Sequence, residues 1–137
     1  DLDLPTAQVE TMLAEGFVPV LHGDGIAQEG AGVTVLSGDE IVVELAGALG
    51  ADRVGTCSTA PGVLDAEGNV LDRIEDYAAV ADALGDSEAT DVTGGMAGKV
   101  RTLLELDAPA WVFDLEGLAT FLDGGSPGTR IGDDGSR

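Results

Sequence analysis

The sequence is poor in cysteine, in lysine and in long apolar runs, and each shortage excludes a class of protein. Cys57 is the only cysteine in 137 residues, so no internal disulfide can form and a secreted disulfide scaffold is excluded. No apolar run approaches the ~18 residues that a membrane span requires. The first residues, Asp1-Leu2-Asp3, offer neither a basic start nor an apolar stretch, so no signal peptide is predicted. We therefore expect a segment of a longer cytoplasmic protein.

Basic residues are few and acidic residues are abundant. Lys and Arg number 6 and Asp and Glu number 26, which gives a net charge of −20. That charge excludes nucleic-acid binding through a basic surface and argues against docking on anionic membranes. A carboxylate surface suits concentrated salt, where screening shortens the range of self-repulsion to a few ångströms. The composition therefore indicates a halophilic protein, with an acidic mesophilic domain as the alternative.

The pattern of apolar residues predicts strands that alternate with helices. At 44% hydrophobic residues the chain can bury a core, and we expect one domain over residues 1–137 with a frayed tail over 132–137. The fold class is α/β, with an open, mainly parallel sheet and helices on both faces in three layers. Predicted strands are Phe17–His22, Arg53–Cys57, Ala110–Phe113 and an edge strand Thr129–Ile131, with hairpins joining 26–27 to 33–36 and 63–64 to 70–71. Predicted helices cover Thr6–Glu15, Tyr77–Leu84 and Glu116–Leu122, and further helices begin at Ser37 and near Gly95.

Ligands bind such sheets beyond the carboxyl ends of the strands, and one glycine-rich segment stands out there. Thr93-Gly94-Gly95-Met96-Ala97-Gly98-Lys99 places paired glycines before a predicted helix. Glycines allow close approach of the backbone, and N–H groups at a helix start attract anions. Lys99, the single lysine, follows one turn later. The segment is not a Walker A loop, because the spacing of G-x-x-x-x-G-K-[ST] is absent. The alternative is a structural glycine turn beside an exposed lysine.

The other candidates are weaker. Ser37-Gly38-Asp39 opens a helix and suits a second phosphate, while Ser37 or Asp39 is alternatively a simple N-cap. His22, the only histidine, ends a predicted strand and is interpreted as structural. Cys57 on an apolar strand is interpreted as inert core. No Ser/His/Asp arrangement and no metal-ligand spacing is present, so no metal site is predicted.

These segments, in this order, resemble the C-terminal half of the amino acid kinase superfamily, and most of all its isopentenyl phosphate kinases. The resemblance covers nearly the whole chain. The matching stretches are Pro19-Val20-Leu21-His22-Gly23-Asp24, Leu36-Ser37-Gly38-Asp39-Glu40-Ile41, Pro61-Gly62-Val63-Leu64, and Asp91-Val92-Thr93-Gly94-Gly95-Met96 with Lys99.

The resemblance implies roles for individual residues. Gly94, Gly95 and Lys99 match the segment that binds ATP phosphates, and Lys99 and Asp39 are the implied catalytic residues, Asp39 by orienting active-site cations. Gly38 is implied to hold the acceptor phosphate. The loop after Cys57 borders the nucleotide, which implies ATP contacts at Thr59 and Gly62. Here the chain departs from the family pattern Thr-Asp-Val-Asp-Gly, because Thr59 replaces a carboxylate.

The implied function is ATP-dependent phosphorylation of isopentenyl phosphate to the diphosphate, a step of archaeal isoprenoid biosynthesis by the mevalonate route. ATP and Mg²⁺ are the implied cofactors. The family's N-terminal half supplies an acceptor loop and a catalytic histidine that this chain lacks, so we expect the isolated segment to be inactive. Expected partners are that missing half, a small-molecule phosphate acceptor and a second copy in a homodimer, with no nucleic acid and no membrane. Two alternatives stay open: a kinase for an amino acid, uridylate or phosphonate, and a non-catalytic nucleotide-binding or dimerisation module.

Overall fold

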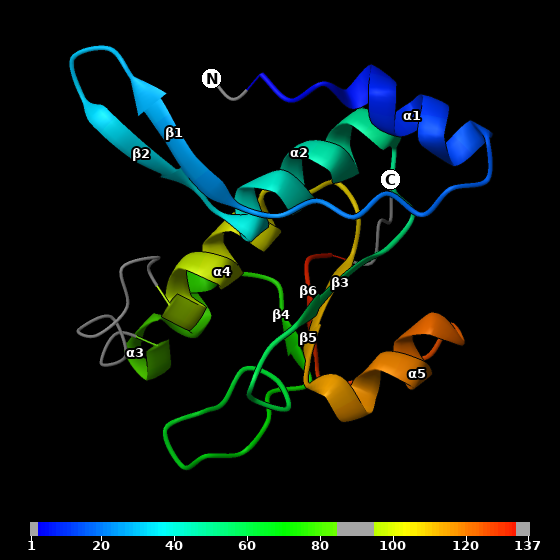
Figure 1. Ribbon diagram of the computed structural model, residues 1–137. Helices are drawn as coiled ribbons and strands as arrows, with labels where there is room; N and C mark the ends of the chain where they lie inside the picture. Colours follow the sequence, from blue (N-terminus) through cyan, green and yellow to red (C-terminus); the bar gives the residue numbers. More distant parts are fainter. Residues whose placement is uncertain (1–2, 85–94, 134–137) are drawn as a thin grey trace. The chain divides into compact units, whose positions relative to one another are not determined.

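The computed structural model describes residues 3–84 and 95–133, and the chain divides into two compact units, 1–51 and 52–137 (Figure 1). The expectation of a single domain did not include this division. Of the tail expected to fray over 132–137, positions 134–137 lie outside the described residues. No helix in the described part of the chain is long and apolar enough to cross a membrane.

The first unit holds two helices and one hairpin. Helix α1 (Thr6–Ala14) is followed by β1 (Asp24–Gln28), β2 (Gly32–Leu36) and α2 (Gly38–Leu49). The predicted hairpin is confirmed, with Asp24 opposite Leu36 and Gln28 opposite Gly32. Its turn places Gly30 and Gly32 at φ 80°, a conformation that side chains other than glycine rarely adopt.

Both helices of the first unit end at a predicted glycine. Gly16 has φ 82°, and the N–H groups of Gly16 and Phe17 donate to the carbonyls of Leu13 and Met12. Gly50 ends α2 in the same way at φ 61°. This pairing of the last carbonyls with a left-handed glycine is the Schellman arrangement. The glycine positions alone therefore fix where both helices stop.

The prediction of a buried strand at Phe17–His22 is wrong. These residues take part in no strand, and the side chains of Phe17, Val18 and Val20 are 63%, 86% and 90% exposed. An apolar run indicates that a segment is suited to burial. A strand forms, however, only where a neighbouring segment pairs with its backbone. Neither sheet in the described part of the chain supplies that neighbour.

The second unit is built on a four-stranded open sheet. The strands are β3 (Val54–Cys57), β4 (Arg73–Ile74), β5 (Ala110–Phe113) and β6 (Thr129–Ile131), in the order β3-β5-β6-β4. The β3–β5 and β4–β6 pairings are parallel and the β5–β6 pairing is antiparallel. The sheet is thus open and mainly parallel, as expected. The prediction that Thr129–Ile131 is an edge strand is wrong, because β6 lies between β5 and the two-residue strand β4.

Helices cover both faces of this sheet (Figure 1). Helix α4 (Gly95–Leu104) buries Ala97, Val100 and Leu103, which recur every third residue along one face. Helix α5 (Leu118–Leu122) lies on the other side, where the Phe121 ring stacks on Phe113 with centroids 5.1 Å apart. The unit also holds short helices: η1 (Tyr77–Ala79), α3 (Ala81–Leu84) and η3 (Leu115–Gly117).

Three smaller predictions need correction. The helix expected over Glu116–Leu122 is divided into η3 and α5. The helix expected over Tyr77–Leu84 is split into η1 and α3, because the Asp76 carboxylate accepts the Ala78 N–H and tightens the first turn. Cys57 is exposed and is not inert core. It is the last residue of β3, where the chain leaves the sheet and Ser58 donates to the Phe113 carbonyl at 2.7 Å.

We expect the melting temperature of this chain to rise steeply with salt. Six basic side chains cannot pair with 26 acidic ones, so repulsion opposes folding in dilute buffer. Each kcal/mol relieved raises Tm by about 2–8 °C. Thermal unfolding in 0.05–3 M KCl measures the effect. Because the Debye length is already ~3 Å at 1 M, most of the gain should come below 1 M. An unchanged Tm between dilute buffer and molar KCl contradicts the prediction.

Candidate functional site

The start of α4 is built as the glycine-lysine motif predicts. Gly95 is the first helical residue and has φ 55°. Lys99, half-buried, follows four residues later on the same face of the helix, and helical side chains lean toward the N-terminus. The N-terminal N–H groups and the helix dipole give this end a partial positive charge, which the Lys99 ammonium reinforces. Gly94 lies outside the described residues.

The loop after β3 is held at the carboxyl ends of the parallel strands β3 and β5. Ser58 donates its N–H to Phe113, the last residue of the parallel neighbour β5, and its hydroxyl both donates to the Ala60 carbonyl and accepts the Ala60 N–H. Thr59 is exposed, whereas Gly62 is buried. Thr59 therefore sits where ligands of parallel sheets bind, and Gly62 belongs to the packing beneath it.

The start of α4 and this loop both belong to the second unit. Five residues connect the end of α4 to the start of β5, so α4 ends toward the amino end of that strand. The path can be followed in Figure 1. Gly95, Lys99, Thr59 and Gly62 all belong to the second unit, and their meeting in one nucleotide site stays a prediction.

The first unit carries the other candidates. The Ser37 hydroxyl accepts the Glu40 N–H at 3.2 Å, and the Glu40 carboxylate accepts the Ser37 N–H at 2.7 Å, which forms a capping box. Ser37 is therefore an N-cap, the simpler of its two interpretations. Gly38 is exposed and Asp39 is half-buried, both in the first turn of α2. His22 is exposed, with its Nδ1 2.9 Å from the Gly23 carbonyl oxygen.

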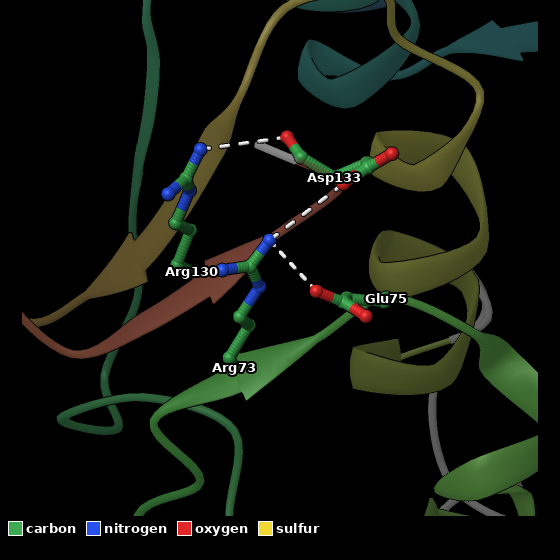
Figure 2. Close-up of polar contacts among 4 residues, drawn as sticks. All are labelled: Arg73, Glu75, Arg130 and Asp133. Atoms are coloured by element: carbon green, nitrogen blue, oxygen red, sulfur yellow. Dashed lines mark hydrogen bonds and ion pairs between the residues drawn. The ribbon is translucent and has the colours of Figure 1, made fainter. Parts of the chain in front are cut away.

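The four arginines in the described part of the second unit are used in packing. The Arg53 guanidinium lies 4.4 Å from the Trp111 ring centroid and 4.5 Å from that of Phe121. Arg101 donates to the Tyr77 hydroxyl at 2.8 Å. Arg73 contacts the carboxylates of Glu75 at 2.7 Å and Asp133 at 3.8 Å, and Arg130 donates to the Asp133 carbonyl (Figure 2). These contacts give Arg53, Arg73, Arg101 and Arg130 structural roles.

A hollow of about 530 Å³ lies at the other end of the strands, beyond the carboxyl ends of β4 and β6 and near the C-terminal end of α4. Its lining includes four carboxylates, those of Glu75, Glu105, Asp107 and Asp133. A surface of that charge repels phosphate groups. The hollow is therefore no candidate for the nucleotide. No group of three or more His, Cys, Asp or Glu side chains arranged for a metal ion occurs in the described part of the chain.

A hydrogen-bond network behind Gly62 was missed at the sequence level. The Thr129 hydroxyl accepts the Val63 N–H at 2.8 Å and donates to the Leu71 carbonyl at 2.6 Å. Further along the chain from Val63, the Asp65 carboxylate closes the turn over 65–69. The hydrogen bond that it accepts from the Asn69 backbone N–H is the main cause that lowers the pKa of the Asp65 carboxyl. A threonine at the start of the three-residue strand β6 was the only signal in the sequence.

Comparison with known proteins identifies the family of this chain. The family model described as "Amino acid kinase family" matches residues 1–107. The chain belongs to the amino acid kinase family. An isopentenyl phosphate kinase of Haloferax volcanii is 65% identical over 130 residues, covering 95% of this chain and 52% of that protein. An isopentenyl phosphate kinase of Methanocaldococcus jannaschii is 32% identical over 111 residues, covering 80% of this chain and 42% of that protein.

The fold is that of a solved isopentenyl phosphate kinase structure, with a TM-score of 0.72 at 23% identity, covering 95% of this chain and 51% of the other. The resemblance found in the sequence is therefore confirmed. The Haloferax relative also agrees with the halophilic interpretation of the composition. The chain spans about half the length of the curated relatives it matches.

Proposed function

We propose that the whole protein transfers the γ-phosphoryl group of ATP to isopentenyl phosphate, and that this chain supplies the nucleotide-binding part. The observation that carries the proposal is the 65% identity over 130 residues to the Haloferax volcanii isopentenyl phosphate kinase. The product would be isopentenyl diphosphate, a precursor in isoprenoid synthesis by the mevalonate route. We place the enzyme in the cytoplasm.

In this proposal each candidate residue has one task. The Lys99 ammonium stabilises the negative charge on the transferring phosphoryl group, and the backbone at Gly94 and Gly95 contacts the ATP phosphates. Thr59 and Gly62 belong to the loop that borders the nucleotide. Gly38 holds the acceptor phosphate, and Asp39 orients cations. Phosphoryl transfer asks little more of a protein than positioning and charge stabilisation.

Electrostatics explain why these few groups must act locally. A chain with a net charge of −20 repels ATP at long range, so binding depends on screening by salt and on cations next to the phosphates. Lys99 and the start of α4 supply such a positive site within one helical turn. Mg²⁺ accompanies ATP and offsets phosphate charge. Among the described residues no three carboxylates are arranged to hold a metal ion, so we assign it no ligand in this chain.

The choice of acceptor and the oligomeric state depend on the part of the protein that this chain does not span. We propose a homodimer in which each subunit joins this chain to the half that the relatives have and this chain does not span. Within the family, an acceptor other than isopentenyl phosphate is the competing proposal. An assay of the whole protein with isopentenyl phosphate, N-acetylglutamate and uridylate side by side separates them.

We expect ATP to bind the 137-residue chain in molar KCl and to shield Cys57. The single thiol is exposed at the end of β3, directly before the loop that borders the nucleotide. At an ATP concentration ten times Kd, about one site in eleven is empty, so alkylation should slow about tenfold. At 100 Kd, binding should stabilise the fold by ~2.7 kcal/mol, visible as a rise in Tm.

Two controls accompany the alkylation experiment. AMP lacks the phosphates that Lys99 and Gly95 would contact, and should protect Cys57 much less. The urea-unfolded chain should react at the same rate with and without ATP. If ATP changes neither the alkylation rate nor the Tm of the folded chain, the nucleotide-binding role is wrong.

A further inference from the structure

The loop that follows β3 is fastened to the sheet at both of its ends. At its first residue, Ser58 donates to the Phe113 carbonyl of β5 at 2.7 Å. At its far end, Val63 donates to the Thr129 hydroxyl of β6 at 2.8 Å. Thr59 lies between these two anchors and is exposed. The anchors restrict where Thr59 and its neighbours can lie.

The Thr129 hydroxyl is a buried junction. Thr129 is fully buried, and its one hydroxyl accepts from Val63 and donates to the Leu71 carbonyl at 2.6 Å. Leu71 in turn donates its N–H to the Val63 carbonyl at 2.8 Å. The hydroxyl thus accepts one hydrogen bond and donates another, and so joins β6 to both Val63 and Leu71.

Two glycines allow the loop to lie directly on β6. A Cβ added to Gly62 would be 2.7 Å from the Thr129 Oγ1 and 2.7 Å from the Val70 Cγ1. Gly128 has φ 64°, and a Cβ there would collide with the Val112 carbonyl oxygen and lie 2.7 Å from that of Pro61. The loop backbone therefore approaches β6 closely enough for the Thr129 hydroxyl to reach it.

We propose that Thr129 is a positioning residue for nucleotide binding: its hydroxyl holds the loop over 58–63 in the conformation that receives ATP. This inference rests on the proposed function. Thr129 has no exposed surface, so it acts through the loop and not by touching the ligand. Without the hydroxyl, the buried N–H of Val63 and the carbonyl of Leu71 lose their partner, and the loop must be ordered by ATP itself. Part of the binding free energy is then consumed, and affinity falls.

The test compares substitutions at Thr129 with a matched threonine elsewhere in the sheet. Thr129→Val removes the hydroxyl and keeps the shape, Thr129→Ala removes it without placing a methyl group against Leu71, and Thr129→Ser retains it. Thr56→Val is the control, because the buried Thr56 hydroxyl donates to the Trp111 carbonyl at 3.1 Å within the sheet and does not bind the loop. Each variant is measured in molar KCl for Tm, for hydrogen exchange at the amides of Val63 and Leu71, and for ATP affinity by titration.

We expect Thr129→Val and Thr129→Ala to weaken ATP binding about tenfold and to speed amide exchange at Val63 by a similar factor, the scale set by one lost buried hydrogen bond. Thr129→Ser should restore both. Thr56→Val should lower Tm without weakening ATP binding. If Thr129→Val fails to fold, Thr129→Ala decides.

Different outcomes overturn different claims. Unchanged ATP affinity in Thr129→Ala, with Tm lowered as in Thr56→Val, makes Thr129 purely structural. If Thr56→Val loses as much ATP affinity as Thr129→Val, the effect is not specific to the loop and the positioning role of Thr129 is wrong. If the unmodified chain binds no ATP, the proposed function fails and the positioning role fails with it, while slow exchange at Val63 would still show that the loop is held.

Discussion

Lys99→Ala is expected to lower kcat by about 10²–10³ while leaving the fold intact. The magnitude is that of losing one preorganised charge contact to the transition state, ~3–4 kcal/mol. Lys99 stands one turn inside α4, where its ammonium adds to the positive end of the helix. Negative charge develops on the phosphoryl oxygens during transfer, so a cation there stabilises the transition state more than the bound substrate.

The measurement uses a chimera in which this chain replaces the matching half of the Haloferax volcanii relative, with kcat, KM for ATP and Tm taken from the same preparations. Arg101→Ala is the matched control, since it removes a cation from the same helix that is engaged with Tyr77 through a 2.8 Å hydrogen bond and lies 4.2 Å above its ring. Arg101→Ala should lower Tm and leave kcat nearly unchanged. Lys99→Arg should recover only part of the activity, because a planar guanidinium differs in shape from a compact ammonium. Wild-type kcat in Lys99→Ala would mean that the glycine turn is only structural.

Local signals predicted the elements of the second unit well. Strands β5 and β6 have the predicted bounds and β3 begins one residue later than expected, since short apolar runs between turn residues leave few alternatives. Strand β4 was missed because two residues form no pattern. Because β4 was not predicted, β6 was predicted to be an edge strand. Strand order depends on contacts across the chain, which periodicity does not report.

For the candidate site, the sequence predicted the glycine-lysine helix start but not what supports the loop after β3. Gly95 and Lys99 lie in one short motif, so their local geometry follows from the helix that this motif begins. The link from Thr129 to Val63 joins residues 66 positions apart. Such a link appears only once the sheet has formed. The placement of Cys57 was misjudged for a related reason: an apolar neighbourhood in sequence does not reveal where a strand leaves the sheet.

The exposed segment Phe17–Leu21 is another case in which the sequence does not show the partner that a strand needs. Its sequence is that of a buried strand, and four of its five residues are large and apolar. The chain spans about half the length of its curated relatives. We expect a partner strand for this segment in the half of the whole protein that this chain does not span. An apolar segment of this kind left without a partner also favours aggregation of the chain when it is studied alone.

The chain alone is accordingly expected to bind ATP and yet to show no phosphorylation of isopentenyl phosphate. Transfer requires the acceptor to be held in line with the γ-phosphate, and such positioning is worth effective molarities of about 10⁵–10⁸ M. Without the acceptor-binding half, the rate should fall to that of the uncatalysed reaction, a loss of about 10⁶-fold or more. Production of isopentenyl diphosphate is measured for the chain in molar KCl, for the heat-denatured chain, and for the chimera with the Haloferax volcanii half. The chimera should be active, which shows that the chain is competent when the acceptor is held. Activity of the chain alone above the denatured control would mean that these 137 residues contain a complete acceptor site.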